Sequence, residues 1–478
     1  MPFQSLVQMS EQLQAKEISS VELTQYYLDR IREHDPALNC FITVVADRAL
    51  KEAKKADHQR AVGNNGLLTG IPLVHKDLFC VKDVKTTCAS KMLADFVAPY
   101  DATIVRRLNN QGMVCLGKTN MDEFAMGSSG KTSFWGPTVN PWDVTKVAGG
   151  SSSGSAAAVA AGLAPAATGS DTGGSIRQPA AFCGVTGFKP TYGRNSRYGM
   201  VAFSSSLDQP GTLTRTVEDA KLLFDVTNGV DTKDASTINT AADREYKLPR
   251  LTIGYPSKFF EDIPTPLMSV LADVRHTLEK TGHNFKEIEL PDVQKCLATY
   301  FAISRGECVT NLARFDGIRF GFRSKEVSNI DNLYTKTRIE GFGAEVKRRI
   351  LFGNYVLTNG KPETHFVKAQ KVRRLIHDRY TQTFNDVDFI LAPSAPTVAA
   401  PVLADDHDQF ELYRQDRFTV AANLGGLPAI GVPCGTVNSL PVGIQLIGPR
   451  FSDWQLLELA AEYQRLTDWH LRYPSKFL

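Results

Sequence analysis

The stretch from residue 148 to residue 182 constrains the fold of this 478-residue chain more than any other segment. It reads AGGSSSGSAAAVAAGLAPAATGSDTGGSIRQPAAF, with glycine and serine concentrated in two turns around an alanine-rich segment. Alanine favours helix, so we predict a helix over Ser155–Leu163 with unusual backbone angles on either side. The second turn, Gly169–Ile176, offers consecutive amides just before a predicted short helix over Ser175–Phe182. An oxyanion could bind against these amides.

Two ordinary explanations of such a composition are a glycine-rich linker and a phosphate-binding loop. The chain contains neither a G-x-x-x-x-G-K-[ST] motif nor a strand-anchored G-x-G-x-x-G motif, so the signatures of nucleotide binding are missing. A flexible linker would not include an alanine-rich helix and the apolar segment Ala164–Thr168. We therefore interpret the stretch as a site built from backbone amides and loop hydroxyls.

A serine nucleophile needs a base, and the sequence favours lysine over histidine for this role. None of the nine histidines lies in a recognisable triad motif, and Gly149–Gly154 matches G-x-S-x-G only approximately. Lys76 lies in the apolar, strand-like run Leu67–Phe79, where burial would lower its pKa towards neutrality. His75 and Asp77 are its competitors, and we expect His75 to pack on the opposite face of the strand.

These residues resemble the motifs of the amidase signature family. Lys76 matches the lysine of the Lys-Asp motif, Gly149–Ser151 the first serine loop, and Gly169–Ser175 the second. The resemblance implies a Ser-cis-Ser-Lys triad with Ser175 as acylated nucleophile, Ser151 as proton relay after a cis peptide bond, and neutral Lys76 as terminal base. It also implies an oxyanion hole made by the backbone amides of Thr172, Gly173, Gly174 and Ser175. The implied fold is α/β, with a large mixed twisted β-sheet covered by helices on both faces.

Within that family, the chain is most similar to the glutaminase subunits of tRNA-dependent amidotransferases. The runs Met121–Ser128 and Asn311–Gly317 carry this finer similarity. It implies that the chain hydrolyses glutamine and passes ammonia to a partner, within a complex that also contains subunits B and C. The partner would amidate Glu-tRNA(Gln), Asp-tRNA(Asn) or both, would bind most of the tRNA, and would use ATP and Mg²⁺, whereas this subunit needs no cofactor.

The same similarity assigns residues to the substrate pocket. In these subunits an arginine holds the α-carboxylate of free glutamine and an aspartate holds its α-amino group. We assign the arginine to Arg349 and the aspartate to Asp416, which suits the pairing of a guanidinium with a carboxylate and of a carboxylate with an ammonium. Ser128 and Ser129 are expected to border the substrate as well.

The chain departs from the pattern of these subunits at three places. Gly130–Thr132 replaces a Thr-Glu-Asn run, Lys361–Phe366 replaces a tyrosine-rich run, and Ser153 stands where glycine is usual. The first two would border the substrate pocket or the ammonia exit. A stand-alone amidase for another small amide and a catalytically silent scaffold subunit therefore stay open as alternatives.

The composition is typical of a large globular enzyme. With 42% hydrophobic residues we expect a single amidase domain over 1–478, with core motifs in 70–220 and substrate-pocket segments in 300–450. The net charge of +3 is too balanced for a nucleic-acid footprint. Eight cysteines without a C-x-x-C pair predict buried thiols rather than zinc ligands or disulfides. Without a signal segment or a bilayer-length apolar run, a cytoplasmic location is expected.

Apolar patterning predicts alternating strands and helices. Ser19 and Glu22 form a capping-box pattern before an amphipathic helix, and residues 228–250 are polar enough to predict an exposed connection. The predicted strands are Met113–Gly117, Leu251–Tyr255, Asp388–Ala392, Ala429–Pro433 and Pro441–Ile447, and further helices are predicted over Thr216–Thr227 and Trp454–Arg465. Such alternation indicates a sheet covered by helices.

Overall fold

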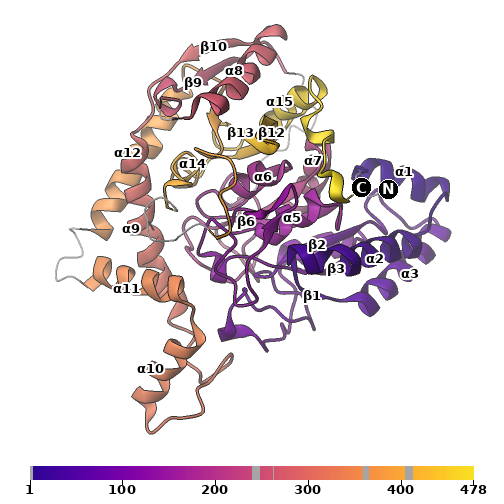
Figure 1. The fold of residues 1–478 in the computed structure, drawn as a ribbon, viewed down its shortest axis with the longest axis vertical. Coiled ribbons are helices and arrows are strands. Elements are labelled where there is room, and N and C mark those ends of the chain that lie inside the picture. The colour runs from indigo at the N-terminus through magenta and orange to yellow at the C-terminus, as the bar shows by residue number, and fades with distance from the viewer. Residues whose placement is uncertain (1–3, 239–247, 262, 359–364, 404–412, 478) are drawn as a thin grey trace.

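The computed structural model describes residues 4–238, 248–261, 263–358, 365–403 and 413–477. Within these residues a mixed sheet of eleven strands runs in the order β1-β3-β2-β6-β8-β7-β12-β13-β11-β9-β10 (Figure 1). The strands are β1 (Phe41–Val44), β2 (Pro72–Lys76), β3 (Val114–Thr119), β6 (Ala166–Asp171), β7 (Thr186–Lys189), β8 (Gln209–Thr214), β9 (Thr252–Tyr255), β10 (Asn284–Glu287), β11 (Phe389–Pro393), β12 (Ala429–Val437) and β13 (Leu440–Ile447). A separate ribbon pairs β4 (Val139–Asn140) with β5 (Asp143–Val147).

Helices cover the sheet, and a helical arm extends from it at the lower left of Figure 1. The helices are α1 (Leu6–Ala15), α2 (Ser20–Leu38), α3 (Ala46–Ala61), α4 (Thr103–Asn110), α5 (Ser153–Ala160), α6 (Arg177–Cys183), α7 (Val217–Thr227), α8 (Thr265–Lys280), α9 (Val293–Leu312), α10 (Ile330–Gly341), α11 (Ala344–Thr358), α12 (Phe366–Thr383), α14 (Val420–Gly425) and α15 (Asp453–Arg465). The arm is formed by α10 and the loop before it, and α11 connects it to the body.

Strand β7 shows why both faces of the sheet are covered. Successive residues of a strand point to opposite faces. Gly187 faces α6, where a Cβ would approach Ala180 Cβ to 2.7 Å, and the next residue, Phe188, packs edge-to-face on Phe224 of α7 at 5.1 Å between ring centroids. The predicted fold class, a large mixed sheet with helices on both faces, is therefore confirmed.

Local signals account for several elements. The Ser19 hydroxyl accepts from the Glu22 amide while the Glu22 carboxylate accepts from the Ser19 amide, so the predicted capping box is present at the start of α2. Every residue of α5 is buried, which its small side chains permit on all sides of the helix. All five predicted strands and the predicted helices lie within one to four residues of their observed bounds.

Two predictions need correction. The short helix predicted from Ser175 begins at Arg177, because Ser175 and Ile176 form a turn ahead of it. The connection predicted as exposed over residues 228–250 includes two buried carboxylates, Asp231 and Asp234, and its residues 239–247 lie outside the described ones. Asp231 accepts a hydrogen bond from Ser196 Oγ at 2.6 Å, so this part of the connection is held against the body.

The core divides into two hydrophobic clusters that share the one sheet. The first surrounds β2, β3 and β6 and includes side chains of α1 to α5, and the second surrounds β9 and β11 to β13 and includes side chains of α8, α9, α12 and α15. The first glycine- and serine-rich turn leads into α5, and the second lies between β6 and α6. The division of the chain into a single domain stays a prediction.

Candidate active site

Lys76 ends β2, a strand that is buried along its whole length between β3 and β6. Its side chain is fully buried, and its Nζ donates to Ser151 Oγ at 2.8 Å. The same Nζ lies 2.9 Å from Ser152 Oγ and 2.9 Å from Ser170 Oγ. Burial lowers the pKa of Lys76 to about 7, although nearby carboxylates oppose this shift. The site therefore contains an amine that can exchange protons near neutral pH, surrounded by hydroxyls.

The two neighbours of Lys76 have other partners. The Asp77 carboxylate accepts from the buried Lys118 Nζ at 3.0 Å, and His75 Nδ1 lies 3.2 Å from Thr168 Oγ1. Burial lowers the pKa of His75 to about 3, so this imidazole is neutral. Neither side chain joins the hydroxyl cluster around Lys76.

The loop that carries Ser151 is joined to the loop that carries Ser175. The peptide bond between Gly150 and Ser151 is cis, as the resemblance implied. The Gly150 amide donates to Gln178 Oε1 at 2.9 Å, and the Ser152 amide donates to the Ser175 carbonyl at 3.2 Å. Within the described chain the Ser175 hydroxyl has no hydrogen-bond partner, and its residue is buried. A hydroxyl at this place is free to react with a ligand.

The amides of the predicted oxyanion hole fall into two groups. The Gly174 amide donates to Asp171 Oδ1 at 2.8 Å, so it is already engaged and the expected set of four needs correction. Among the described residues, the amides of Thr172, Gly173 and Ser175 donate to no protein acceptor. Gly174 has φ +138°, and a Cβ there would come within 2.3 Å of Thr419 Oγ1, so only glycine fits this turn.

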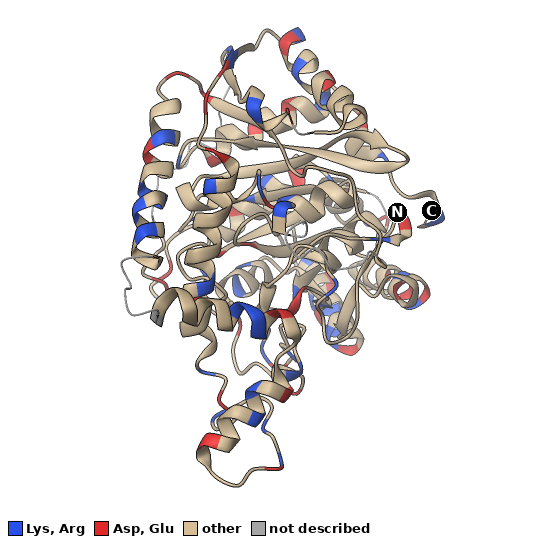
Figure 2. Cartoon of the chain, turned by 60° about the vertical axis from the view of Figure 1, so that its left-hand side comes forward, with Lys and Arg blue, Asp and Glu red and all other residues tan. Residues whose placement is uncertain are grey.

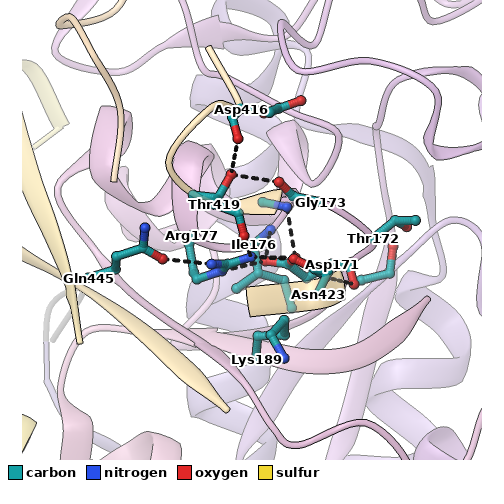
Figure 3. A network of polar contacts seen from close by, with 12 residues as sticks. Asp171, Thr172, Gly173, Ile176, Arg177, Lys189, Asp416, Thr419, Asn423 and Gln445 are labelled. Atoms are coloured by element: carbon teal, nitrogen blue, oxygen red, sulfur yellow. Dashed lines mark hydrogen bonds and ion pairs between the residues drawn. The ribbon is translucent and has the colours of Figure 1, made fainter. Parts of the chain in front are cut away.

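A buried ion pair fixes this turn from below (Figure 3). Arg177 Nε and Nη2 donate to the two carboxylate oxygens of Asp171, each at 3.0 Å. Arg177 also donates to Asn423 Oδ1 at 2.7 Å and to Gln445 Oε1 at 2.6 Å. Burial alone would raise the pKa of Asp171, but the Arg177 charge and hydrogen bonds hold it well below its usual range. This network was not predicted from the sequence, although Asp171 lies within the second serine loop and Arg177 only two residues beyond it.

Thr419 joins this turn to the predicted substrate aspartate. Its Oγ1 lies 2.6 Å from the Gly173 carbonyl and 3.0 Å from the Asp416 carbonyl (Figure 3). Oδ1 of Asp416 is buried and has no hydrogen-bond partner in the described chain. Burial raises the pKa of Asp416 to about 7, against a hydrogen bond from Ser128 and the charge of Arg349. A buried carboxylate oxygen without a partner suits an incoming ammonium group.

A cavity of about 260 Å³ opens between the loop after residue 126 and α11. Three of the predicted substrate residues, Ser128, Ser129 and Arg349, line it, whereas Ser175 and Asp416 are not among its lining residues. Arg349 Nε donates to Glu345 Oε1 at 2.7 Å, and the Tyr413 hydroxyl donates to the same oxygen at 2.9 Å. Glu345 thus orients the arginine, and this contact was not predicted from the sequence.

The three departures from the expected pattern have different settings. Lys131 and Thr132 line the cavity, which agrees with the predicted place of the first departure. Ser153 begins α5, and its Oγ lies 3.3 Å from Thr138 Oγ1. Residues 361–364 of the second departure, Lys361–Phe366, lie outside the described ones.

The described residues form neither a metal site nor a disulfide. Among the described residues no cluster of three or more His, Cys, Asp or Glu side chains could hold a metal ion. All eight cysteines are buried free thiols. None of the helices in the described ranges has both the length and the apolar character needed to cross a bilayer.

Three comparisons with known proteins identify the same family. The family model described as Amidase matches residues 22–457. The chain is 50% identical over 477 residues to the A subunit of the glutamyl-tRNA(Gln) amidotransferase of Coxiella burnetii, covering 98% of this chain and 99% of that protein. The corresponding protein from Marinobacter nauticus is 49% identical over 483 residues, covering 98% of this chain and 99% of that protein. The crystal structure of the corresponding protein from Thermotoga maritima has a TM-score of 0.77 and 38% identity, covering 92% of this chain and 90% of that one. The chain therefore belongs to the amidase signature family.

Proposed function

We propose that this chain is the glutaminase subunit of a tRNA-dependent amidotransferase. It hydrolyses glutamine at the Ser175 site and passes the ammonia to a partner subunit, which amidates Glu-tRNA(Gln) or Asp-tRNA(Asn). The full-length similarity to glutamyl-tRNA(Gln) amidotransferase A subunits supports this role. ATP and Mg²⁺ act in the partner, which together with a third subunit completes the complex and binds most of the tRNA.

The observation that carries the proposed chemistry is the 2.8 Å contact between Lys76 Nζ and Ser151 Oγ, made by a lysine whose pKa lies at about 7. As Ser175 Oγ attacks the side-chain amide carbon of glutamine, its proton passes to Ser151 while Ser151 gives its own proton to neutral Lys76. The amides of Thr172, Gly173 and Ser175 stabilise the oxyanion.

The same relay then runs backwards. Lys76 returns the proton through Ser151 to the leaving nitrogen. The carbon–nitrogen bond then breaks, ammonia departs, and a glutamyl ester remains on Ser175. Water attacks this ester while Lys76 again accepts a proton through Ser151, and the proton returns to Ser175 Oγ as the ester bond breaks and glutamate leaves. Arg349 and Asp416 hold the α-carboxylate and α-ammonium of glutamine during both steps.

Mass spectrometry of the intermediate tests this proposal. The wild-type complex is quenched in acid during turnover of glutamine and digested, and the glutamyl ester is located on the peptides. We expect it on the peptide that contains Ser175 and expect none in the Ser175→Ala variant. An ester on another peptide, or glutamate formation without any ester, would overturn the assignment.

The stand-alone amidase remains the second candidate, and no observation favours it over the first. The two differ in whether glutamine is hydrolysed in step with amidation of tRNA. If a short amide without an α-carboxylate were hydrolysed faster than glutamine by the complete complex, the stand-alone function would be preferred.

A further inference from the structure

The second half of α11 exposes apolar side chains to solvent. From residue 350 to residue 358 the helix contains no charged residue. Leu351 is 71% exposed, Phe352 45% and Tyr355 53%, and we call these three side chains the apolar face of α11. A helix that presents large apolar side chains in a row usually buries them against another surface.

The opposite side of α11 is already packed. Val346, Gly353 and Val356 are buried, and a Cβ on Gly353 would come within 2.1 Å of the Arg305 carbonyl of α9. This close approach fixes the rotation of α11, so the apolar face must point outwards. It is therefore a constant surface of the folded chain rather than a consequence of loose packing.

The apolar face continues the rim of the cavity that Ser128, Ser129 and Arg349 line. Arg348 lines the cavity, and Leu351, Phe352 and Tyr355 follow it at i+3, i+4 and i+7, which places all four on one side of the helix. With about 1.5 Å of rise per residue, the face begins roughly 5 Å from Arg348 and ends roughly 10 Å from it. A protein that covered this face would also lie over the mouth of the cavity.

The segment of the chain that contains the face has an excess of positive charge. Residues 313–358, which comprise the arm with α10 and all of α11, contain nine Lys and Arg against five Asp and Glu. This excess exceeds the net charge of +3 for the whole chain. Figure 2 shows charged residues of both signs on α10, the helix at the bottom of the view, so the positive excess comes from the rest of this segment. A partner with an apolar centre and an acidic rim would match this surface.

We propose that the apolar face of α11 is the docking surface of the subunit that receives the ammonia, and that this subunit presents an apolar patch rimmed by Asp and Glu. The inference rests on the proposed function. Ammonia that enters bulk water at neutral pH is protonated and loses its nucleophilicity. The acceptor must therefore meet the chain close to the site of hydrolysis, and within the described residues α11 carries both Arg349 and large exposed apolar side chains.

The test uses two matched leucines. Leu351→Glu changes the apolar face, and Leu375→Glu makes the same substitution on α12 at a leucine that is 68% exposed and outside the face. Each variant is titrated with the partner subunits, and the glutamate released per amide formed on tRNA is measured in the assembled complex. Thermal unfolding of each free chain checks that both variants fold.

We expect Leu351→Glu to weaken subunit binding at least tenfold and to raise the glutamate released per amide, whereas Leu375→Glu stays within twofold of the wild type. In the wild type, raising the salt concentration should slow association, because the opposing charges become screened. Equal binding by the two variants, or an association rate independent of salt, would overturn the docking surface. If the wild-type complex released no ammonia from glutamine, the proposed function would fail instead.

Discussion

The two sides of the candidate site are built in different ways. The catalytic side, with Lys76, Ser151 and Ser175, comes from the first half of the chain and is closely packed, and the Lys76 amine has three hydroxyls within 2.9 Å. The substrate side, with Arg349 and Asp416, comes from distant segments and retains a buried carboxylate oxygen without a partner in the described chain. The proton relay from Ser151 to Lys76 is thus already in contact before a ligand binds, whereas Asp416 keeps one carboxylate oxygen that a ligand has yet to satisfy.

The largest expected effect is on the catalytic side. Ser175→Ala should lower glutamine hydrolysis by at least about four orders of magnitude, because removal of the nucleophile leaves only the contributions of binding and the oxyanion site. Ammonia release from glutamine is measured in the assembled complex. Partner binding and thermal unfolding should match the wild type, since the Ser175 hydroxyl has no partner in the described chain. Near-normal ammonia release would contradict the assignment.

Lys76→Met should lower kcat by about 10²–10⁴-fold, the usual contribution of a positioned base. Lys76→Arg should be equally impaired, since a guanidinium does not act as a base near neutral pH. Lys189→Met is a matched control: burial lowers the pKa of Lys189 to about 7 as well, but its Nζ contacts the carbonyls of Pro190 and Leu427 rather than hydroxyls.

In Lys189→Met, the free energy of unfolding should fall, while the pH dependence of kcat should stay that of the wild type. A Lys76→Arg variant that worked as well as the wild type at pH 8 would remove the relay from the mechanism.

On the substrate side, Arg349→Ala and Asp416→Ala should each lower kcat/KM for glutamine. The loss should correspond to about 2–5 kcal/mol of activation free energy, which is the cost of removing one partner of a desolvated charge pair. Amidation of tRNA with added ammonium should stay near the wild-type rate, because ammonia enters after the step these residues serve. Lys347→Ala, on the same helix, serves as the control and should change neither reaction. Equal loss of both reactions would mean that the two residues support folding or assembly.

The smallest expected effect is a difference in pH dependence between the two sides. Lys76 must be neutral and Asp416 must be ionised, and the pKa of each lies at about 7 in the free chain. Below pH 7 both requirements are lost, so kcat/KM should fall about a hundredfold per pH unit in the acid limit. In Asp416→Asn only the lysine titrates, and the fall becomes tenfold per unit. An unchanged slope in this variant would exclude Asp416 from glutamine binding.

The sequence predicts the catalytic side far better than the substrate side, and the reason is distance along the chain. Lys76, Ser151 and Ser175 lie in short motifs whose residue types indicate their chemistry. Ser170 next to Lys76 could not be predicted, because only the parallel pairing of β2 with β6 brings the two strands together. Glu345 lies four residues before Arg349, so helical spacing could have predicted their contact.

The correction at Gly174 has a similar cause. A run of glycine amides predicts an anion site, but the direction of each N–H depends on backbone angles that the sequence does not specify. Here the Asp171 carboxylate accepts a hydrogen bond from one of these amides, that of Gly174. This contact holds the turn in the conformation that leaves the other amides available. The predicted strands and helices match those of the structure, because apolar patterning over long segments depends little on such local contacts.

The ion pair beneath the nucleophile turn has a consequence for how the protein is made. Arg177 emerges early from the ribosome, but Asn423 and Gln445, which hold its guanidinium, are synthesised near the end. Until most of the chain has been translated, it therefore lacks two of the groups that hold the Arg177 guanidinium beneath the nucleophile loop. We expect a chain that ends at residue 418 to show no glutamine hydrolysis although it contains every residue of the triad, so that incomplete chains do not consume the cell's glutamine.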